Sequence, residues 1–150
     1  MTTYTEAVDL MYGRVRELWN AQANASFGYI PTLVYEGTAT NNPQPTDRVW
    51  GRVSEELAIE RLAAFGSGRQ DNRSLYRSVG TLYVELYLPR QDKTSKRRGR
   101  SFMSIVRSGF RGYTADGNLN FRDHTVRTPA TERNWYRYTF VVTYEFYETD

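Results

Sequence analysis

The segment that most constrains the fold is WYRYTFVVTYEFY, which runs from Trp135 to Tyr147. Side chains point alternately to the two faces of a β-strand, and one alternate set of this segment is entirely apolar or aromatic. That set is Tyr136, Tyr138, Phe140, Val142, Tyr144 and Phe146. The other set, which includes Arg137, is mixed. The pattern predicts one strand of about 43 Å, at roughly 3.3 Å per residue, with one buried face.

A second extended segment, Leu75 to Leu88, shows the same alternation and is followed by Pro89, which cannot donate to a strand ladder. One face carries Leu82, Val84, Leu86 and Leu88. The opposite face carries Thr81, Tyr83, Glu85 and Tyr87. Because this second face is amphipathic and not simply polar, we expect another subunit to cover part of it. The candidate subunit interface is Tyr83, Glu85, Tyr87 and Arg137.

Two further segments have the spacing of amphipathic helices. Thr3 to Asn24 has capping-box spacing at Thr3 and Glu6. Its apolar stripe is Val8, Met11, Tyr12, Val15, Leu18 and Trp19. Gln91 to Gly112 is predicted to begin as a basic loop and to continue as a helix. The core stripe of that helix is Phe102, Ile105, Val106, Gly109 and Phe110.

The start of the second helical segment carries the strongest charge cluster in the chain. No acidic residue lies between positions 93 and 111, and the basic residues there are Lys93, Lys96, Arg97, Arg98, Arg100, Arg107 and Arg111. Such a cluster is typical of a surface near nucleic acid or an acidic partner, and also of a solvated helix face. The candidate contacts with a DNA channel or a partner are Lys93, Lys96, Arg97, Arg98 and Arg100.

The other extended segments are shorter. Strands are predicted at Thr32 to Glu36, Arg48 to Val53 and Asn118 to Arg127. Residues 54–65 fit either a continued strand or a short helix, because strong helix formers there coincide with a period of two.

Turn-forming residues predict exposed loops at 37–47 and 66–72, a turn at 114–118 and a connection at 128–131. Taken in order, the elements predict a single α+β domain over residues 1–150. We expect a mostly antiparallel sheet of about four to five strands with two helices packed on it.

The residues that usually carry catalysis or metal binding are scarce. The chain has no cysteine and one histidine, His124, which we expect to be a surface or half-buried residue and not a ligand. Glu55, Glu56 and Glu60 are interpreted as a solvated acidic face. We therefore expect no enzyme activity, no metal and no cofactor.

The opening residues MTTYTEAVDLMYG lack the basic stretch and apolar run of a signal peptide. No stretch approaches the roughly 18 apolar residues that a membrane span requires. We expect synthesis in a reducing cytoplasm and no membrane partner.

The order of these segments resembles the phage tail-terminator or tail-completion family of the lambda type. The resemblance rests on the amphipathic N-terminal helix, on YIPTLVYEG, on VWGRVS after a proline-containing loop, and on NFRDHTVR. The most telling pieces are YRSVGTLYVELYLP and WYRYTFVVTYEFYE. The resemblance covers nearly the whole chain, and residues 54–74 depart from it as an insertion.

The resemblance implies a structural virion protein of the tail neck, made in the host cytoplasm. Such subunits form a hexameric ring that caps the head-proximal end of the tail tube, stops tube polymerisation and joins the capsid connector. The implied partners are further copies of the chain, the tail tube protein and the head–tail connector or stopper. Genomic DNA would pass through the lumen without sequence recognition.

Two alternatives remain open at this point. Another neck or head-completion ring protein would share the same structural class. A basic nucleic-acid-binding module would bind free DNA as a monomer, with a steep dependence on salt concentration.

Overall fold

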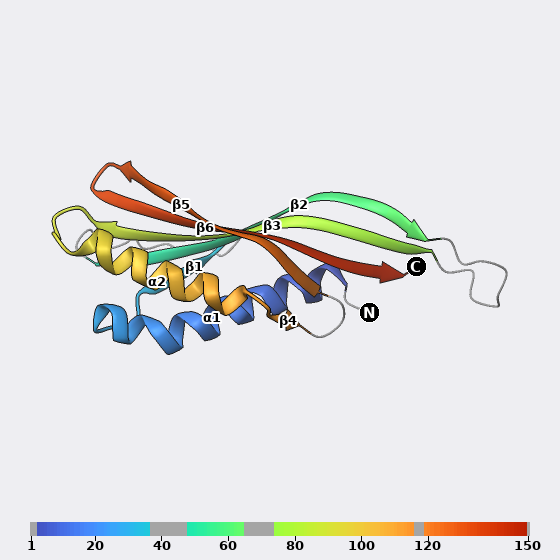
Figure 1. Ribbon diagram of the computed structural model, residues 1–150, viewed down its shortest axis with the longest axis horizontal. Helices are drawn as coiled ribbons and strands as arrows, with labels where there is room; N and C mark the ends of the chain where they lie inside the picture. Colours follow the sequence, from blue (N-terminus) through green and yellow to red (C-terminus); the bar gives the residue numbers. More distant parts are fainter. Residues whose placement is uncertain (1–2, 37–47, 65–73, 116–118, 150) are drawn as a thin grey trace.

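The computed structural model describes residues 3–36, 48–64, 74–115 and 119–149. Two helices lie side by side on one face of a six-stranded sheet, so the predicted α+β class is confirmed (Figure 1). The elements are α1 (Tyr4–Phe27), β1 (Thr32–Tyr35), β2 (Trp50–Ala64), β3 (Leu75–Pro89), α2 (Ser95–Phe110), β4 (Thr114–Ala115), β5 (Leu119–Glu132) and β6 (Trp135–Thr149). The loops predicted at 37–47 and 66–72 lie outside the described residues.

The two long strands predicted from alternation are neighbours at the centre of the sheet, whose order is β1-β2-β3-β6-β5-β4. β3 and β6 pair antiparallel without a register shift from Leu75–Thr149 to Pro89–Trp135. The pairing is antiparallel throughout except for β1, which runs parallel to β2. The sheet has six strands and not four to five, because Thr114 and Ala115, predicted as a turn, pair with β5 as β4.

The uncertain segment after Val53 is strand, because β2 continues to Ala64 along the whole length of β3. Two register shifts, at Leu57/Ile59 and at Leu62/Ala64, accommodate it. Residues such as Glu55, Glu56 and Leu57 favour helices in isolation, but pairing with a long neighbouring strand overrides this local preference. The β2–β3 hairpin extends past the ends of the helices (Figure 1).

β5 is longer than predicted and runs to Glu132, so the connection predicted at 128–131 was wrong. Ala130 and Thr131 pair with Arg137 and Tyr136 of β6. Pro129 is tolerated because it lies within a register shift of a strand near the sheet edge, where no ladder hydrogen bond is needed from it.

The predicted capping box begins α1. Thr3 N donates to Glu6 Oε2 at 2.8 Å, and Glu6 N donates to Thr3 Oγ1 at 3.2 Å. These bonds hold the pKa of Glu6 below its ordinary value. The apolar stripe faces the sheet, with Met11, Val15 and Trp19 fully buried. The helix continues beyond the predicted Asn24, and Phe27 at its end packs on Phe102 of α2.

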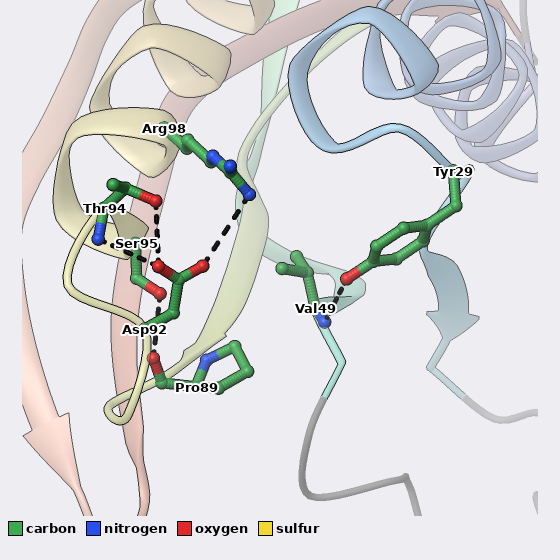
Figure 2. Close-up of polar contacts among 7 residues, drawn as sticks. All are labelled: Tyr29, Val49, Pro89, Asp92, Thr94, Ser95 and Arg98. Atoms are coloured by element: carbon green, nitrogen blue, oxygen red, sulfur yellow. Dashed lines mark hydrogen bonds and ion pairs between the residues drawn. The ribbon is translucent and has the colours of Figure 1, made fainter.

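α2 begins at Ser95, so residues 95–100 are helical and the basic loop predicted from Gln91 onward is limited to the turn before Ser95. Asp92 explains this start, because its Oδ1 accepts hydrogen bonds from Thr94 N at 2.9 Å and from Thr94 Oγ1 at 2.8 Å (Figure 2). Ser95 Oγ donates to Pro89 O at 2.8 Å. Gly99 packs so closely on Leu88 and Tyr138 that a side chain there would clash.

One core lies between the helices and the sheet. It contains the predicted inward residues of both long strands except Tyr136, which is half-buried beside Lys96. Its largest fully buried side chains include Trp19, Tyr144, Phe102, Phe110, Phe140 and Phe146. Within the described residues, neither helix combines the length and the apolar character needed to span a bilayer.

Candidate functional site

The predicted basic residues lie around the first turns of α2. Ser95 and Gly99 are buried against the sheet, so the residues between and around them point outward. All five predicted contact residues are exposed, namely Lys93, Lys96, Arg97, Arg98 and Arg100. Arg107 and Arg111 are exposed as well, but they lie near the other end of α2, about 15 Å farther along at 1.5 Å per residue. The cluster seen in the sequence is therefore divided along the helix.

The ring of Tyr136 on β6 brings two cations together at the start of α2. Lys96 Nζ lies 4.6 Å from the ring centroid, and Arg90 Cζ lies 5.9 Å from it. Tyr138 OH donates to Lys96 O at 2.8 Å, which fixes the helix start on the same strand. Cations within about 6 Å of an aromatic face are attracted by its quadrupole, so the ring partly relieves the repulsion between these two charges.

Two basic residues of this end, Arg90 and Arg133, lie outside the cluster predicted from the sequence. Arg90 N donates to Asn134 O at 2.9 Å, and Arg90 Nη1 donates to Arg133 O at 3.0 Å. The β3–α2 turn and the β5–β6 turn are therefore adjacent (Figure 1). Antiparallel pairing of the two long strands could have predicted this contact. In such a pair the end of β3 lies beside the start of β6, so the turn after β3 and the turn before β6 are neighbours. We refer to Arg90, Lys93, Lys96, Arg97, Arg98, Arg100 and Arg133 as the basic end.

Arg98 has a structural partner within this end. Its Nη1 lies 3.7 Å from Oδ2 of Asp92, whose carboxylate binds the N-cap residue Thr94 (Figure 2). The pKa of Asp92 is lowered mainly by the hydrogen bonds from Thr94, with a smaller contribution from Arg98. Arg98 therefore contributes to the turn that precedes α2, and its removal would leave Asp92 without this ion pair.

The sheet face opposite the helices, called the open face below, carries an aromatic cluster near the basic end. Trp50 stacks on Tyr87 with ring centroids 4.0 Å apart and planes 4° apart, and Trp135 meets Trp50 edge-on at 6.2 Å. Trp50 and Trp135 are half-buried, and Trp50 Nε1 is buried without a hydrogen-bond partner in the described part of the chain. Indole groups of this kind are enriched at protein interfaces.

The four residues predicted for the subunit interface share the open face. β3 pairs with β6 at Tyr83–Val141, Glu85–Thr139 and Tyr87–Arg137, and directly paired side chains project to the same side. Tyr83, Glu85 and Arg137 are half-buried, whereas Tyr87 is only 4% exposed because its own chain covers it. Tyr87 can therefore support this surface but offers little area of its own.

Polar contacts connect these open-face side chains. Arg52 Nη2 lies 2.7 Å from Glu85 Oε2, and Tyr87 OH donates to the same oxygen at 2.6 Å. Burial, together with the bond to Glu85, raises the pKa of Tyr87 to about 12. The surface is thus an ordered arrangement of rings and paired charges, and it resembles the mixed composition of protein–protein contact surfaces.

The residues first considered for chemistry have structural roles. A ring nitrogen of His124 lies 3.1 Å from Phe110 O, and its ring packs on Phe140. The interpretation of Glu55 as part of a solvated face was wrong, because its carboxylate accepts hydrogen bonds from Tyr4 and Tyr144 on the helix-covered face. Glu56 and Glu60 are exposed. Among the described residues, no group of His, Cys, Asp or Glu side chains is arranged to hold a metal ion.

Comparisons with known proteins add little to this geometry. No protein-family model matches the chain, and no curated protein matches it. One solved structure aligns with 91% of this chain and 93% of its own chain, at 18% sequence identity and a TM-score of 0.48. Similarity at this level assigns neither a family nor a function.

Proposed function

We propose that this chain is a structural virion subunit that assembles into a ring at the head-proximal end of a phage tail tube. The ring ends tube polymerisation and joins the tail to the capsid connector. The order of segments described above suggests this role, and the surfaces of the folded chain are compatible with it.

The observation that carries the proposal is the open face of the sheet. Both helices pack on the other face, so within the described residues no helix or second sheet covers this side of the long central strands (Figure 1). Trp50 and Trp135, two of the three tryptophans of the chain, lie on this side. A second copy seated there would cover aromatic surface that the chain itself leaves half-exposed.

The two ends of the molecule supply further support. The basic end offers a positive surface to DNA in a lumen or to an acidic neighbouring ring. At the opposite end, the β2–β3 hairpin projects beyond the helices and exposes Ile59 and Leu62 by 46% and 41% (Figure 1). An elongated subunit with contact surfaces at both ends suits stacking between a tube and a connector.

Assembly is tested by native mass spectrometry and negative-stain microscopy of the purified chain, alone and with polymerising tail-tube subunits. We expect ring particles, or rings that form on the tube, and tubes whose growth stops when the chain is added. Binding to the tube end distinguishes a terminator from another neck protein. Tubes of unchanged length together with a persistent monomer would contradict the proposal.

The basic end is tested by charge reversal at residues other than Arg98, which pairs with Asp92. The variant Lys93→Glu, Arg97→Glu, Arg100→Glu leaves the Asp92–Arg98 pair in place. We expect it to fold and to lose head–tail joining, measured as the yield of infectious particles. Arg107→Glu with Arg111→Glu, which reverses two charges at the far end of the same helix, is the control. Equal yields from both variants would exclude a role for the basic end.

The same basic end also favours a second candidate, a monomeric nucleic-acid-binding module. This function predicts binding to duplex DNA whose affinity falls steeply with salt and is lost in the first charge-reversal variant. Salt-dependent DNA binding by a chain that neither forms rings nor caps tubes would favour this candidate.

A further inference from the structure

A small hollow lies on the open face at the end opposite the aromatic cluster. It has a volume of about 210 Å³, and its lining residues are Ile59, Arg61, Arg77, Val79 and Arg122. β2 and β3 place these side chains together, because Ile59 pairs with Val79 and Arg61 pairs with Arg77. Arg122 of β5 reaches the hollow from the other side of β6.

The charge in this hollow is unbalanced. Arg77 Nη2 lies 2.7 Å from Glu145 Oε2, and Arg122 Nη2 lies 3.8 Å from the same atom. Among the described residues, three guanidinium groups thus surround the hollow, with one carboxylate between two of them. That carboxylate is ionised at neutral pH, because its bond with Arg77 lowers the pKa of Glu145. The positive excess persists after this pairing.

Two details indicate that the hollow is suited to an anion. Arg61 and Arg77 are directly opposite on neighbouring strands, where like charges destabilise a sheet. Arg77 Nε is buried and has no hydrogen-bond partner within the described residues. A bound carboxylate or phosphate would relieve both costs, since guanidinium groups bind such anions through charge-assisted hydrogen bonds.

The lining also contains apolar surface. Ile59 is 46% exposed at the hollow, and Val79 lies beside it as its cross-strand partner. A side chain that carries a carboxylate on a short aliphatic stem, next to an apolar residue, matches this mixed lining. A nucleic-acid backbone matches it less well, because the cations form a hollow and not a track along which successive phosphates could bind.

We propose that this hollow is a binding site for an acidic segment of a protein partner, with a carboxylate held by Arg61, Arg77 and Arg122 and an adjacent apolar residue on Ile59 and Val79. The inference depends on these side chains and not on the proposed ring. It can therefore fail while the ring assembly stands, or hold for a chain that forms no ring.

The probe is a blocked tetrapeptide Leu-Glu-Leu-Glu, with Leu-Gln-Leu-Gln as its uncharged match. Binding is followed by NMR through the Nε–H resonances of the arginine side chains of the full chain. We expect saturable shifts for the acidic peptide with a Kd of about 1 mM or below, and none for its match. Arg61→Ala and Arg122→Ala, both at exposed residues, should each weaken binding about tenfold.

Arg100→Ala on α2 is the matched control and should bind as the unmodified chain does. Amide spectra of all variants establish that the fold is retained. Arg61→Gln is used in place of Arg61→Ala if that variant does not fold. The proposal is overturned by an absence of saturable shifts, or by equal affinity in the Arg61 and Arg122 variants. Displacement of the peptide by inorganic phosphate or duplex DNA at lower concentration would also overturn the choice of a protein partner.

Discussion

Tyr144 on β6 reaches across β3 and donates a hydrogen bond of 2.8 Å to Oε2 of Glu55 on β2. The glycine at position 80 of β3 makes this crossing possible, because a β-carbon there would collide with the end of the Tyr144 side chain. Tyr4 of α1 donates to the other carboxylate oxygen of Glu55. One acidic side chain thus connects two strands and the beginning of a helix at the edge of the core.

Replacement of this carboxylate should destabilise the fold. Glu55→Gln removes the charge that accepts both tyrosine hydrogen bonds, and we expect the free energy of unfolding to fall by about 1–3 kcal/mol. Urea unfolding monitored by circular dichroism measures the change. Glu56→Gln, at the exposed neighbouring residue, is the control and should change stability by less than about 0.5 kcal/mol. Similar losses in both variants would contradict the role assigned to Glu55.

Replacing glycine with alanine should change the free energy of unfolding in opposite directions at two positions. Gly80→Ala places a β-carbon against Tyr144 and against the backbone oxygen of Glu56, and it should cost about 1–3 kcal/mol of unfolding free energy. Gly13→Ala, within α1 and facing open space, should stabilise the chain by about 0.5–1 kcal/mol because alanine favours the helix. Thermal unfolding of the two variants side by side is the measurement. Unchanged stability of Gly80→Ala would contradict the close packing assigned to this position.

Stability should decrease at alkaline pH. The hydrogen bond to Glu55 raises the pKa of Tyr4 to about 12, burial raises that of Tyr12 to about 12, and burial raises the pKa of Tyr144 still further. The folded chain therefore retains protons that the unfolded chain loses near pH 10, so this stabilisation is complete below pH 10 and is lost as the pH rises through 12.

Urea unfolding at a series of pH values from about 8 to 11.5 tests this dependence. We expect a flat region followed by a decline above about pH 10, and a shallower decline in Tyr144→Phe because one of the shifted groups is absent. A free energy of unfolding that stays constant or rises above pH 10 would contradict the assignment.

The contact between the two helices should depend on Arg14. Its Nη2 and Nε donate to Gly109 O of α2 at 2.7 and 3.2 Å, and its guanidinium lies 4.3 Å from the centroid of the Tyr113 ring. Arg14→Met leaves this carbonyl near the helix end without its donors, and we expect a loss of about 1–3 kcal/mol. Chemical denaturation compares it with Arg100→Met, an exposed residue that should tolerate the change. Equal stability of the two variants would exclude the capping role.

The candidate surfaces were only partly predictable. Tyr83, Glu85 and Arg137 could be placed on one face because alternation within a strand decides which way each side chain points. Arg90 and Arg133 are 43 residues apart in sequence, and their contact depends on how two turns meet. The hollow is likewise built from three different strands, so no local pattern in the sequence marks it.

The sequence by itself determined the two central strands, the inward faces of both helices and the α+β class, because these follow from the period of apolar residues within one segment. Only the tertiary structure decided that residues 54–64 are strand, that β5 continues through Pro129, and that Glu55 is held by two tyrosines. Each of these depends on a partner distant in the chain. Periodicity records the preference of a segment for one buried face, whereas pairing partners and register shifts depend on contacts that no single segment contains.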